Sequence, residues 1–209
     1  SSSSCIKFGI RTIEVDAKKG LRINGKQVLL KGGCVHHDNG LLGSASYPVS
    51  EWRKVKKLKE NGYNAIRCAH NPPSTAFLDA CDQLGMYVID EAFDCWREGK
   101  KLNDEHIFFE THWKEELQSM ILRDRNHPCV IMWSTGNEIV ERSGLSDGAA
   151  WSKKLADAVR EIDRSRPVTN ALCGFFEDQI IAEMEANIKS TTGEGKDYWA
   201  SRSEKFCEP

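Results

Sequence analysis

The chain has 209 residues, of which 40% are hydrophobic and 29% are charged, and its formal net charge is -2. This length and composition are typical of a single globular domain with a buried core. The balanced charge argues against nucleic acid or an anionic membrane surface as a partner, and no apolar run approaches the roughly 20 residues that span a bilayer.

Eight cysteines lie along the chain, and several of them sit inside apolar runs. They are Cys5, Cys34, Cys68, Cys81, Cys95, Cys129, Cys173 and Cys207. Because no two of them form a CxxC pair, we expect buried free thiols rather than a zinc ribbon. The start, residues 1–4, lacks the basic and apolar regions of a signal peptide. Free thiols favour a reducing compartment, so we expect a cytoplasmic protein, with a periplasmic or secreted one as the alternative.

The first part of the chain, residues 5–31, has the pattern of β structure. Residues 10–15 alternate between apolar and polar side chains, and residues 21–30 carry Asn24 and Gly25 between two strand-like runs. Asn-Gly is a strong hairpin signal because both residues tolerate a positive φ. We therefore predict a β-hairpin that leads into the rest of the chain.

From residue 28 onward, strand-like and helix-like segments alternate. In chain order we expect a buried strand over 28–35, a helix over 50–60, a strand over 64–69, a helix over 72–84, a strand over 86–90, a helix over 108–123, a strand over 128–134, a helix over 150–162 and a strand over 167–172. Short apolar strands that alternate with helices predict an α/β fold with a parallel sheet and right-handed crossovers. The choice is between a doubly wound sheet and a (β/α)8 barrel.

Polar and ionisable side chains follow nearly every predicted strand. They are His36, His37 and Asp38 after the first, Arg67, His70 and Asn71 around the end of the second, Asp90, Glu91 and Asp94 after the third, and Asn137 and Glu138 after the fourth. Such chemistry at the carboxyl ends of successive strands is typical of the active face of a barrel. The pair Gly32 and Gly33 is too short for a dinucleotide-binding loop. We therefore predict the N-terminal part of a (β/α)8 TIM barrel, with about five of its eight strands.

The run that ends in Asn137 and Glu138 is the most specific feature. Glycoside cleavage needs a carboxylic acid that protonates the departing oxygen and then, once ionised, activates water. Glu138 fits this role if partial burial beside Trp133 and a neighbouring carboxylate keep it protonated. Asn137 could hold the 2-hydroxyl group of the sugar. The alternative for this pair is a helix N-cap on the loop after the strand.

Several other residues have two interpretations. Asp94 contacts sugar hydroxyls or caps the following segment, and Trp96 stacks on a sugar face or packs in the core. Trp133 could also stack on a sugar, whereas Trp52 and Trp113 are expected in the core on their helices.

Four runs resemble, in order and spacing, the catalytic barrel of glycoside hydrolase family 2, which includes β-galactosidases, β-glucuronidases and β-mannosidases. They are LKGGCVHH (30–37), NAIRCAHNPP (64–73), VIDEAFD (88–94) and RDRNHPCVIMWSTGNE (123–138). The resemblance implies a retaining β-glycosidase that hydrolyses terminal β-linked sugars, with Glu138 as general acid/base. It also implies that residues 1–27 are a linker and the end of a preceding β-sandwich domain, and that residues 28–209 are part of the barrel.

The resemblance implies roles for further residues. Asn137 would contact the 2-hydroxyl group, and His36 and His70 would line the sugar pocket. Arg67 would support the carboxylates from the floor of the barrel. Asp90 and Glu91 occupy the positions of an acidic pair in the family.

The chain departs from the family pattern in two places. The nucleophilic glutamate of the family follows the seventh strand, so we expect it beyond the end of this chain, and the chain alone should be inactive. The glutamates of the tail do not end apolar strands: Glu177, Glu183, Glu185, Glu194, Glu204 and Glu208. Cys95 and Arg97 stand where some β-galactosidases have an acid and a histidine that bind magnesium, so we expect no metal and no cofactor.

Two other functions stay open from the sequence. The first is a non-catalytic fragment that binds carbohydrate without hydrolysis. The second is a metal-dependent barrel hydrolase that holds zinc with His36, His37 and His70. In either case a partial barrel would expose its edge strands, so we also expect self-association through these edges.

Overall fold

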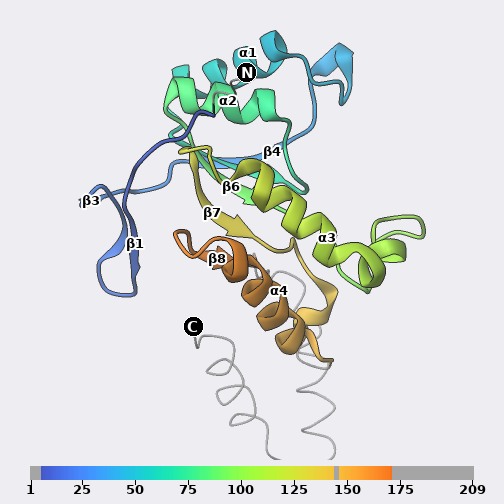
Figure 1. The fold of residues 1–209 in the computed structure, drawn as a ribbon. Helices are drawn as coiled ribbons and strands as arrows, with labels where there is room; N and C mark the ends of the chain where they lie inside the picture. The colour runs from blue at the N-terminus through green and yellow to red at the C-terminus, as the bar shows by residue number, and fades with distance from the viewer. Residues whose placement is uncertain (1–5, 144–145, 171–209) are drawn as a thin grey trace, which may run out of the picture.

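A small antiparallel sheet opens the chain in the computed structural model, which describes residues 6–143 and 146–170 (Figure 1). It consists of β1 (Ile13–Asp16), β2 (Gly20–Ile23) and β3 (Lys26–Gln27). Asn24 and Gly25 form the turn between β2 and β3 with φ values of 51° and 72°. The hairpin prediction is therefore confirmed, whereas the assignment of residues 1–27 to the end of a β-sandwich domain stays a prediction.

The main sheet has five parallel strands in sequential order. They are β4 (Gly32–His36), β5 (Ala65–Ala69), β6 (Tyr87–Glu91), β7 (Val130–Ser134) and β8 (Val168–Thr169). A doubly wound sheet would place strands out of sequence and helices on both faces. Sequential order with helices on the outer face is the arrangement of successive strands in a (β/α)8 barrel, which confirms the predicted fold class.

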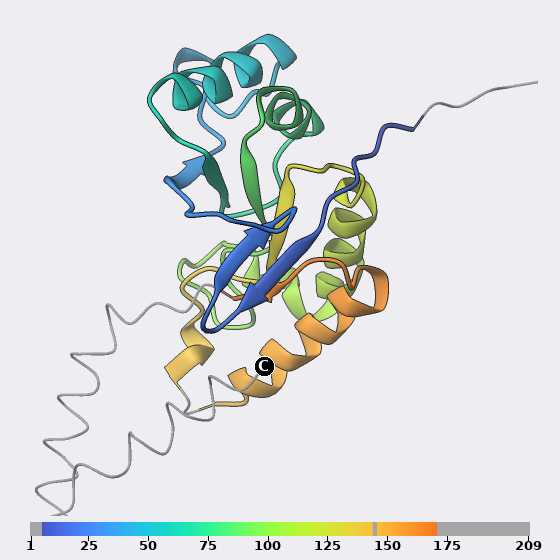
Figure 2. The same ribbon diagram turned by 90° about the vertical axis from the view of Figure 1, so that its left-hand side faces the viewer.

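Four helices connect these strands and cover the outer face of the sheet (Figures 1 and 2). They are α1 (Pro48–Glu60), α2 (Thr75–Leu84), α3 (His106–Asp124) and α4 (Gly148–Ile162), with short 3-10 helices η1 (Gly40–Leu42) and η2 (Val140–Ser143). α2 begins later than predicted because the Ser74 side chain accepts a hydrogen bond from the Phe77 amide and caps the helix. It ends at Gly85, whose φ of 66° suits glycine.

The hydrophobic core lies between the sheet and the helices. Alternate side chains of the strands point into this layer and meet side chains of the helices. The largest fully buried ones include Ile66 and Trp133 from the strands and Leu78, Leu117, Ile121 and Leu155 from the helices. The intervening strand residues point to the inner face, where Cys34 pairs in register with Arg67, and Glu91 with Ser134. This alternation decides which polar residues can reach a ligand in the barrel.

The expected buried strand over 28–35 is wrong in two respects. The strand begins at Gly32, and Gly32, Gly33 and Cys34 are exposed. The reason is that β4 lies at the edge of the sheet, where β5 is its neighbour among the described strands. A Cβ atom on Gly32 would collide with the carbonyl group of Ala65, so this close pairing requires glycine.

The core predictions for the helices and thiols have mixed outcomes. Trp113 is buried as predicted, but Trp52 is 38% exposed and its ring lies beside the Lys56 ammonium group instead. Of the described cysteines, Cys68, Cys81, Cys95 and Cys129 are buried and free, whereas Cys34 is free and exposed. Cys5, Cys173, Cys207 and the tail glutamates lie outside the described residues, and the cytoplasmic location inferred from the thiols stays a prediction.

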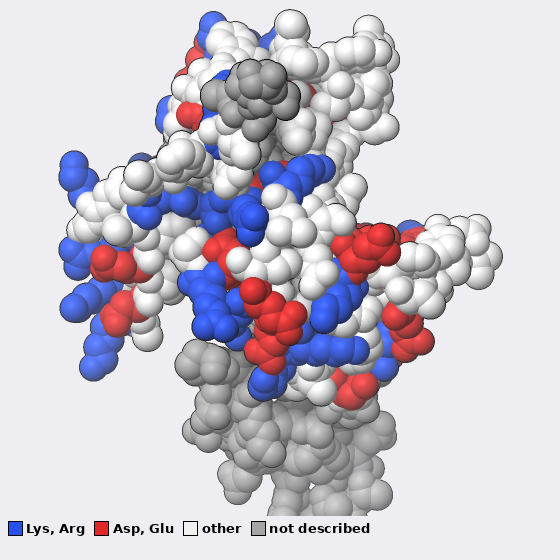
Figure 3. All heavy atoms as spheres, in the orientation of Figure 1, with Lys and Arg blue, Asp and Glu red and all other residues white. Residues whose placement is uncertain are grey.

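The surface carries both signs of charge, and Figure 3 shows lysine and arginine interspersed with aspartate and glutamate on the viewed face. None of the described helices is long and apolar enough to cross a membrane. Among the described strands, β4 and β8 end the sheet on its two sides. Self-association across these edges stays a prediction.

Candidate active site

The carboxyl ends of β4, β5 and β6 border a cavity of about 760 Å³. His36 and His70, which end or follow β4 and β5, line this cavity together with Asp94, which follows β6. Their rings or carboxylates therefore share one opening, as the sequence predicts. Glu105, Glu116 and Arg123, which belong to α3 or its start, line the far side of the same cavity.

Arg67 connects three strand ends beside this cavity. Its Nε donates to Glu91 Oε2 at 2.8 Å, and its Nη2 lies 2.6 Å from the same oxygen. Nη2 also donates to Asn137 Oδ1 at 2.9 Å. Because the Glu91 side chain is 0% exposed, the guanidinium group supplies the positive charge that this buried carboxylate needs.

Glu91 is held on all sides rather than open to a ligand. His70 Nδ1 lies 2.7 Å from Glu91 Oε1, and Ser134 Oγ donates to Oε2 at 2.6 Å. A proton on Nδ1 of His70 would be donated to Glu91 and leave Nε2 free to accept a hydrogen bond. The predicted direct contact between Glu91 and the substrate is therefore not what the structure shows; Glu91 orients Arg67 and His70.

Asn137 is fixed at both ends of its amide group. Arg67 donates to Oδ1, and Nδ2 donates to Asp94 Oδ1 at 2.8 Å. Lys100 Nζ donates to the same Asp94 oxygen at 2.7 Å and to the Asn137 carbonyl oxygen at 2.9 Å. Burial alone would raise the pKa of Asp94, but the hydrogen bonds from Lys100 and Asn137 more than offset this and hold it below its usual value. Asp94 thus presents a charged carboxylate to the cavity.

Glu138 lies directly after this fixed asparagine. Its φ is 44°, a left-handed conformation that is uncommon for a residue other than glycine. The side chain is exposed, so the expected burial beside Trp133 is wrong. The assignment of Glu138 as the acid/base therefore rests on the resemblance to the family and is taken up below as a proposal.

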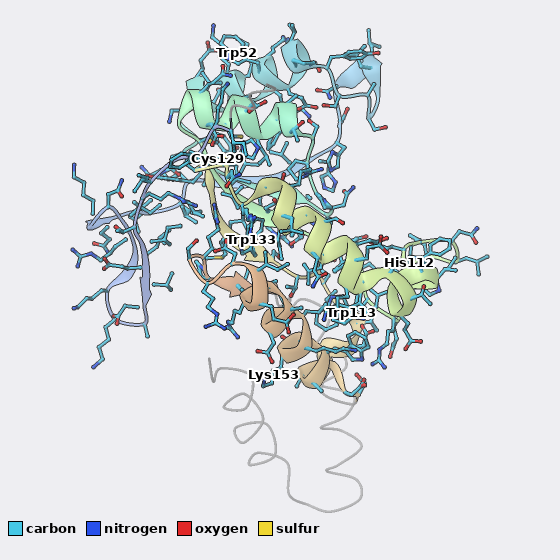
Figure 4. All side chains as sticks on the ribbon, viewed as in Figure 1. Trp52, His112, Trp113, Cys129, Trp133 and Lys153 are labelled. Carbon is cyan, nitrogen blue, oxygen red and sulfur yellow. The ribbon has the colours of Figure 1, made fainter. Side chains whose placement is uncertain are left out.

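Three residues that were expected to contact the sugar cannot reach it. Trp133 and Asp90 point to the helix side of the sheet, and Trp96 is buried in the core. Trp133 is 0% exposed and donates from Nε1 to Asp163 Oδ2 at 2.9 Å, on the helix side of β7 (Figure 4). Trp96 is 2% exposed and donates to the Thr135 carbonyl oxygen at 2.8 Å, so it packs in the core. The strand alternation that turns Glu91 inward turns Asp90 outward.

The environment of Asp90 differs sharply from that of its neighbour Glu91. Asp90 is in register with Trp133 and is 0% exposed. Burial, followed by the nearby Asp124 carboxylate, raises its pKa well above the usual value. The predicted contact of Asp90 with substrate is therefore wrong.

The three histidines do not form a metal site. His70 Nδ1 is committed to Glu91, and His37 Nε2 lies 3.4 Å from the Asn71 carbonyl oxygen. Over 6–143 and 146–170, the group whose ligand atoms lie within 4.8 Å of one another is Asp82 on α2 with His127 and Cys129, which precede β7 at the opposite end of the sheet. At the positions compared with magnesium ligands, Cys95 donates to Asp104 and Arg97 pairs with Asp147.

Lys100 and Ser134 are the functional candidates that the sequence analysis missed. Lys100 lies six residues beyond Asp94 in an irregular loop, where no periodicity indicates the direction of a side chain. Ser134 could have been found from the inward alternation shared with Glu91, had the register between β6 and β7 been known.

Glu105 yields a pH-dependent prediction. Burial, followed by repulsion from Glu116, raises its pKa from 4.5 to about 7. Between these values the folded chain keeps a proton that the unfolded chain releases, so stability falls as the pH rises through this window. We expect Glu105→Gln to match the parent chain below about pH 4 and to melt at a higher temperature near pH 8.

Thermal unfolding across this pH range tests the expectation, with Glu115→Gln, an exposed position on α3, as the matched control. A parent-like pH dependence in the Glu105→Gln variant would show that Glu105 ionises normally in the folded chain.

Comparisons with known proteins agree with this arrangement. The profile of the family described as "Glycosyl hydrolases family 2, TIM barrel domain" matches residues 13–206. A β-galactosidase of Bacteroides ovatus, BoGH2A, is 41% identical over 182 residues, which are 87% of this chain and 20% of that protein. A putative β-glucuronidase of Formosa agariphila is 40% identical over 132 residues, 63% of this chain and 13% of that protein.

Solved structures give the same picture. A glycosyl hydrolase family 2 member from Bacteroides cellulosilyticus is 51% identical with a TM-score of 0.76, over 79% of this chain and 21% of that chain. A β-glycosidase from Bacteroides vulgatus is 37% identical with a TM-score of 0.73, over 78% of this chain and 21% of that chain. The chain thus spans between 13% and 21% of the length of these relatives.

Proposed function

Because the chain belongs to glycosyl hydrolase family 2, as part of its TIM-barrel domain, we propose that the protein hydrolyses terminal β-linked sugars with retention of configuration and uses Glu138 as general acid/base. The observation that carries this proposal is the fixed amide of Asn137, held between Arg67 and Asp94, directly before Glu138. An amide fixed at both ends can orient a sugar hydroxyl group relative to the adjacent carboxyl group.

The proposed reaction has two steps. A carboxylate attacks the anomeric carbon while Glu138 gives its proton to the departing glycosidic oxygen, which forms a glycosyl ester and frees the alcohol. Glu138, now ionised, takes a proton from water, whose oxygen attacks the anomeric carbon and releases the enzyme carboxylate. Each step leaves the configuration inverted once, so the product keeps the β configuration.

We infer that the attacking carboxylate is neither Glu91 nor Asp94. Both oxygens of Glu91 are engaged, by His70 on one and by Arg67 and Ser134 on the other. Asp94 is paired with Lys100 and better suited to accept hydrogen bonds from sugar hydroxyl groups. We infer that a residue outside those described supplies the nucleophile.

The sugar is the part of the proposal that needs a direct experiment, because the relatives carry the names of both β-galactosidases and β-glucuronidases. We would compare two proteins, the polypeptide that the gene encodes (the encoded polypeptide) and the 209-residue chain. Each would be assayed with an aryl β-galactoside, β-glucuronide, β-mannoside and β-glucoside. Nuclear magnetic resonance during turnover would identify which anomer of the released sugar forms first. We expect hydrolysis of one sugar by the encoded polypeptide, the β anomer as first product, and an inactive 209-residue chain.

Other outcomes separate the alternatives. An α anomer as first product would contradict double displacement. Loss of activity with a chelator and recovery with zinc would favour the metal-dependent hydrolase. Equilibrium binding of a sugar by both polypeptides without turnover would favour a carbohydrate-binding fragment, and turnover by the 209-residue chain would place the nucleophile in its tail.

A further inference from the structure

We propose that Lys100 is a positioning residue, whose ammonium group holds the peptide bond between Asn137 and Glu138 together with Asp94, so that the Glu138 carboxyl group reaches the glycosidic oxygen. The inference rests on the proposed function of Glu138. Lys100 touches neither the substrate nor the proton in this proposal, and it acts through the two groups that it holds.

The geometry of Lys100 joins two separate loops. The residue lies in the loop between β6 and α3, and its Nζ donates to Asn137 O at 2.9 Å and to Asp94 Oδ1 at 2.7 Å. The Asn137 oxygen belongs to the peptide unit that also contains the Glu138 nitrogen. The Lys100 side chain is 23% exposed and the Asp94 side chain 46%, so the bond to Asp94 lies at the border of the cavity, and both bonds are charge-assisted.

Glu138 needs such a restraint. Its φ of 44° lies in a sparsely populated region for a residue with a Cβ atom, which persists only where the surroundings fix it. Rotation of the Asn137–Glu138 peptide toward ordinary φ values would turn the Asn137 oxygen away from Lys100. The ammonium group therefore stabilises the backbone conformation that determines the position and direction of the Glu138 side chain.

The loop that carries Lys100 is itself anchored, so it can act as a fixed support. Asp104 accepts hydrogen bonds from the Lys100 and Lys101 amides at 2.7 Å each. Glu141 accepts from the Arg97 and Glu98 amides at 2.9 and 3.0 Å, across from the loop after β7. The Asp104 bonds fix the shape of the loop, and the Glu141 bonds join it to the segment that follows Glu138.

A second contact supports the same clamp. Trp96, four residues before Lys100, donates from Nε1 to the Thr135 carbonyl oxygen at 2.8 Å. The loop after β6 thus holds two carbonyl groups of the segment 135–138, one on each side of Gly136. Lys100 holds the one nearer to Glu138, the Asn137 carbonyl group.

The test compares Lys100→Met, Lys100→Arg and the control Lys101→Met, an exposed lysine one residue further along. Hydrolysis by the encoded polypeptide is measured with a dinitrophenyl glycoside, which leaves without a proton, and with an unactivated disaccharide. We expect Lys100→Met to lower kcat/KM, which reports the first step alone, at least tenfold on the disaccharide and little on the dinitrophenyl substrate, whose leaving group needs no proton. Lys100→Arg should give an intermediate loss on the disaccharide, because the planar guanidinium group keeps the positive charge but not the compact shape of the ammonium group. Lys101→Met should match the parent.

A crystal structure of Lys100→Met gives a readout that needs no turnover. We expect the Asn137–Glu138 peptide to rotate and the φ of Glu138 to leave the left-handed region. An unchanged peptide, or equal losses of kcat/KM on both substrates, would overturn the role of Lys100. If Lys100→Met does not fold, Lys100→Arg carries both measurements, and parent-like values on the disaccharide would overturn it.

A failure of the proposed function would give a different result from a failure of the role of Lys100. If Glu138→Gln keeps full activity on the disaccharide, the acid/base assignment fails, whereas the peptide conformation in the Lys100 variant still decides whether Lys100 holds that peptide.

Discussion

Glu138→Gln should lower kcat/KM for an unactivated β-linked disaccharide by about 10²–10⁴-fold, because an amide can neither give a proton to the departing oxygen nor take one from water. Glutamine has nearly the same shape, and Glu138 is exposed, so the fold should be unaffected. Rates for a series of aryl glycosides give the most direct measurement. The variant should depend far more steeply on the acidity of the leaving phenol than the parent does.

A small anion that acts as an external nucleophile gives a second test of this prediction. Azide needs no general base, so it should restore turnover of an activated aryl glycoside in the Glu138→Gln variant and give a β-glycosyl azide. Glu110→Gln, on the exposed face of α3, is the matched control and should behave as the parent. Disaccharide hydrolysis at the parent rate, without a response to azide, would rule out Glu138 as the acid/base.

Arg67→Met should destabilise the 209-residue chain by about 3–5 kcal/mol, the usual cost of leaving one partner of a buried ion pair alone. The Glu91 side chain is 0% exposed and would keep only His70 and Ser134 as partners. Asn137 would lose the donor to its Oδ1 at the same time. Urea unfolding followed by tryptophan fluorescence is suitable because Trp96 and Trp133 are buried.

Two further variants show whether the loss comes from the unpaired charge. Arg53→Met removes an exposed arginine from α1 and should change the free energy of unfolding by no more than about 0.5 kcal/mol. Arg67→Met combined with Glu91→Gln should recover part of the stability, because a neutral amide replaces the unpaired carboxylate. Equal stability of the Arg67→Met and Arg53→Met variants would mean that Glu91 does not need the guanidinium charge.

The sequence was sufficient for the local elements, for physical reasons that act over a few residues. Asn24 and Gly25 both adopt positive φ values, which their short side chains permit, so the hairpin was readable. Ser74 and Gly85 bound α2 through a side-chain cap and a left-handed turn. The alternation of strands and helices indicated a parallel sheet, and the polar residues after each strand indicated which end of the sheet carries the chemistry.

The tertiary structure alone decided which of these polar residues face the barrel. Asp90 and Glu91 are neighbours in the chain, yet one packs against the helices and the other holds Arg67 and His70. Both faces of a parallel sheet are covered, so its strands lack the apolar–polar alternation that would reveal the inward side. Trp133 was misplaced for the same reason.

Contacts between loops were also beyond the sequence. Lys100 reaches the Asn137 carbonyl oxygen across 37 residues, through an irregular segment without a repeat that could predict its direction. The sequence by itself therefore determined the family, the order of strands and helices, and the position of Asn137 and Glu138 after the fourth strand of the main sheet. The packing of the sheet and the docking of its loops decided which neighbours hold those two residues, because those contacts depend on inter-strand register and on distances that no local pattern encodes.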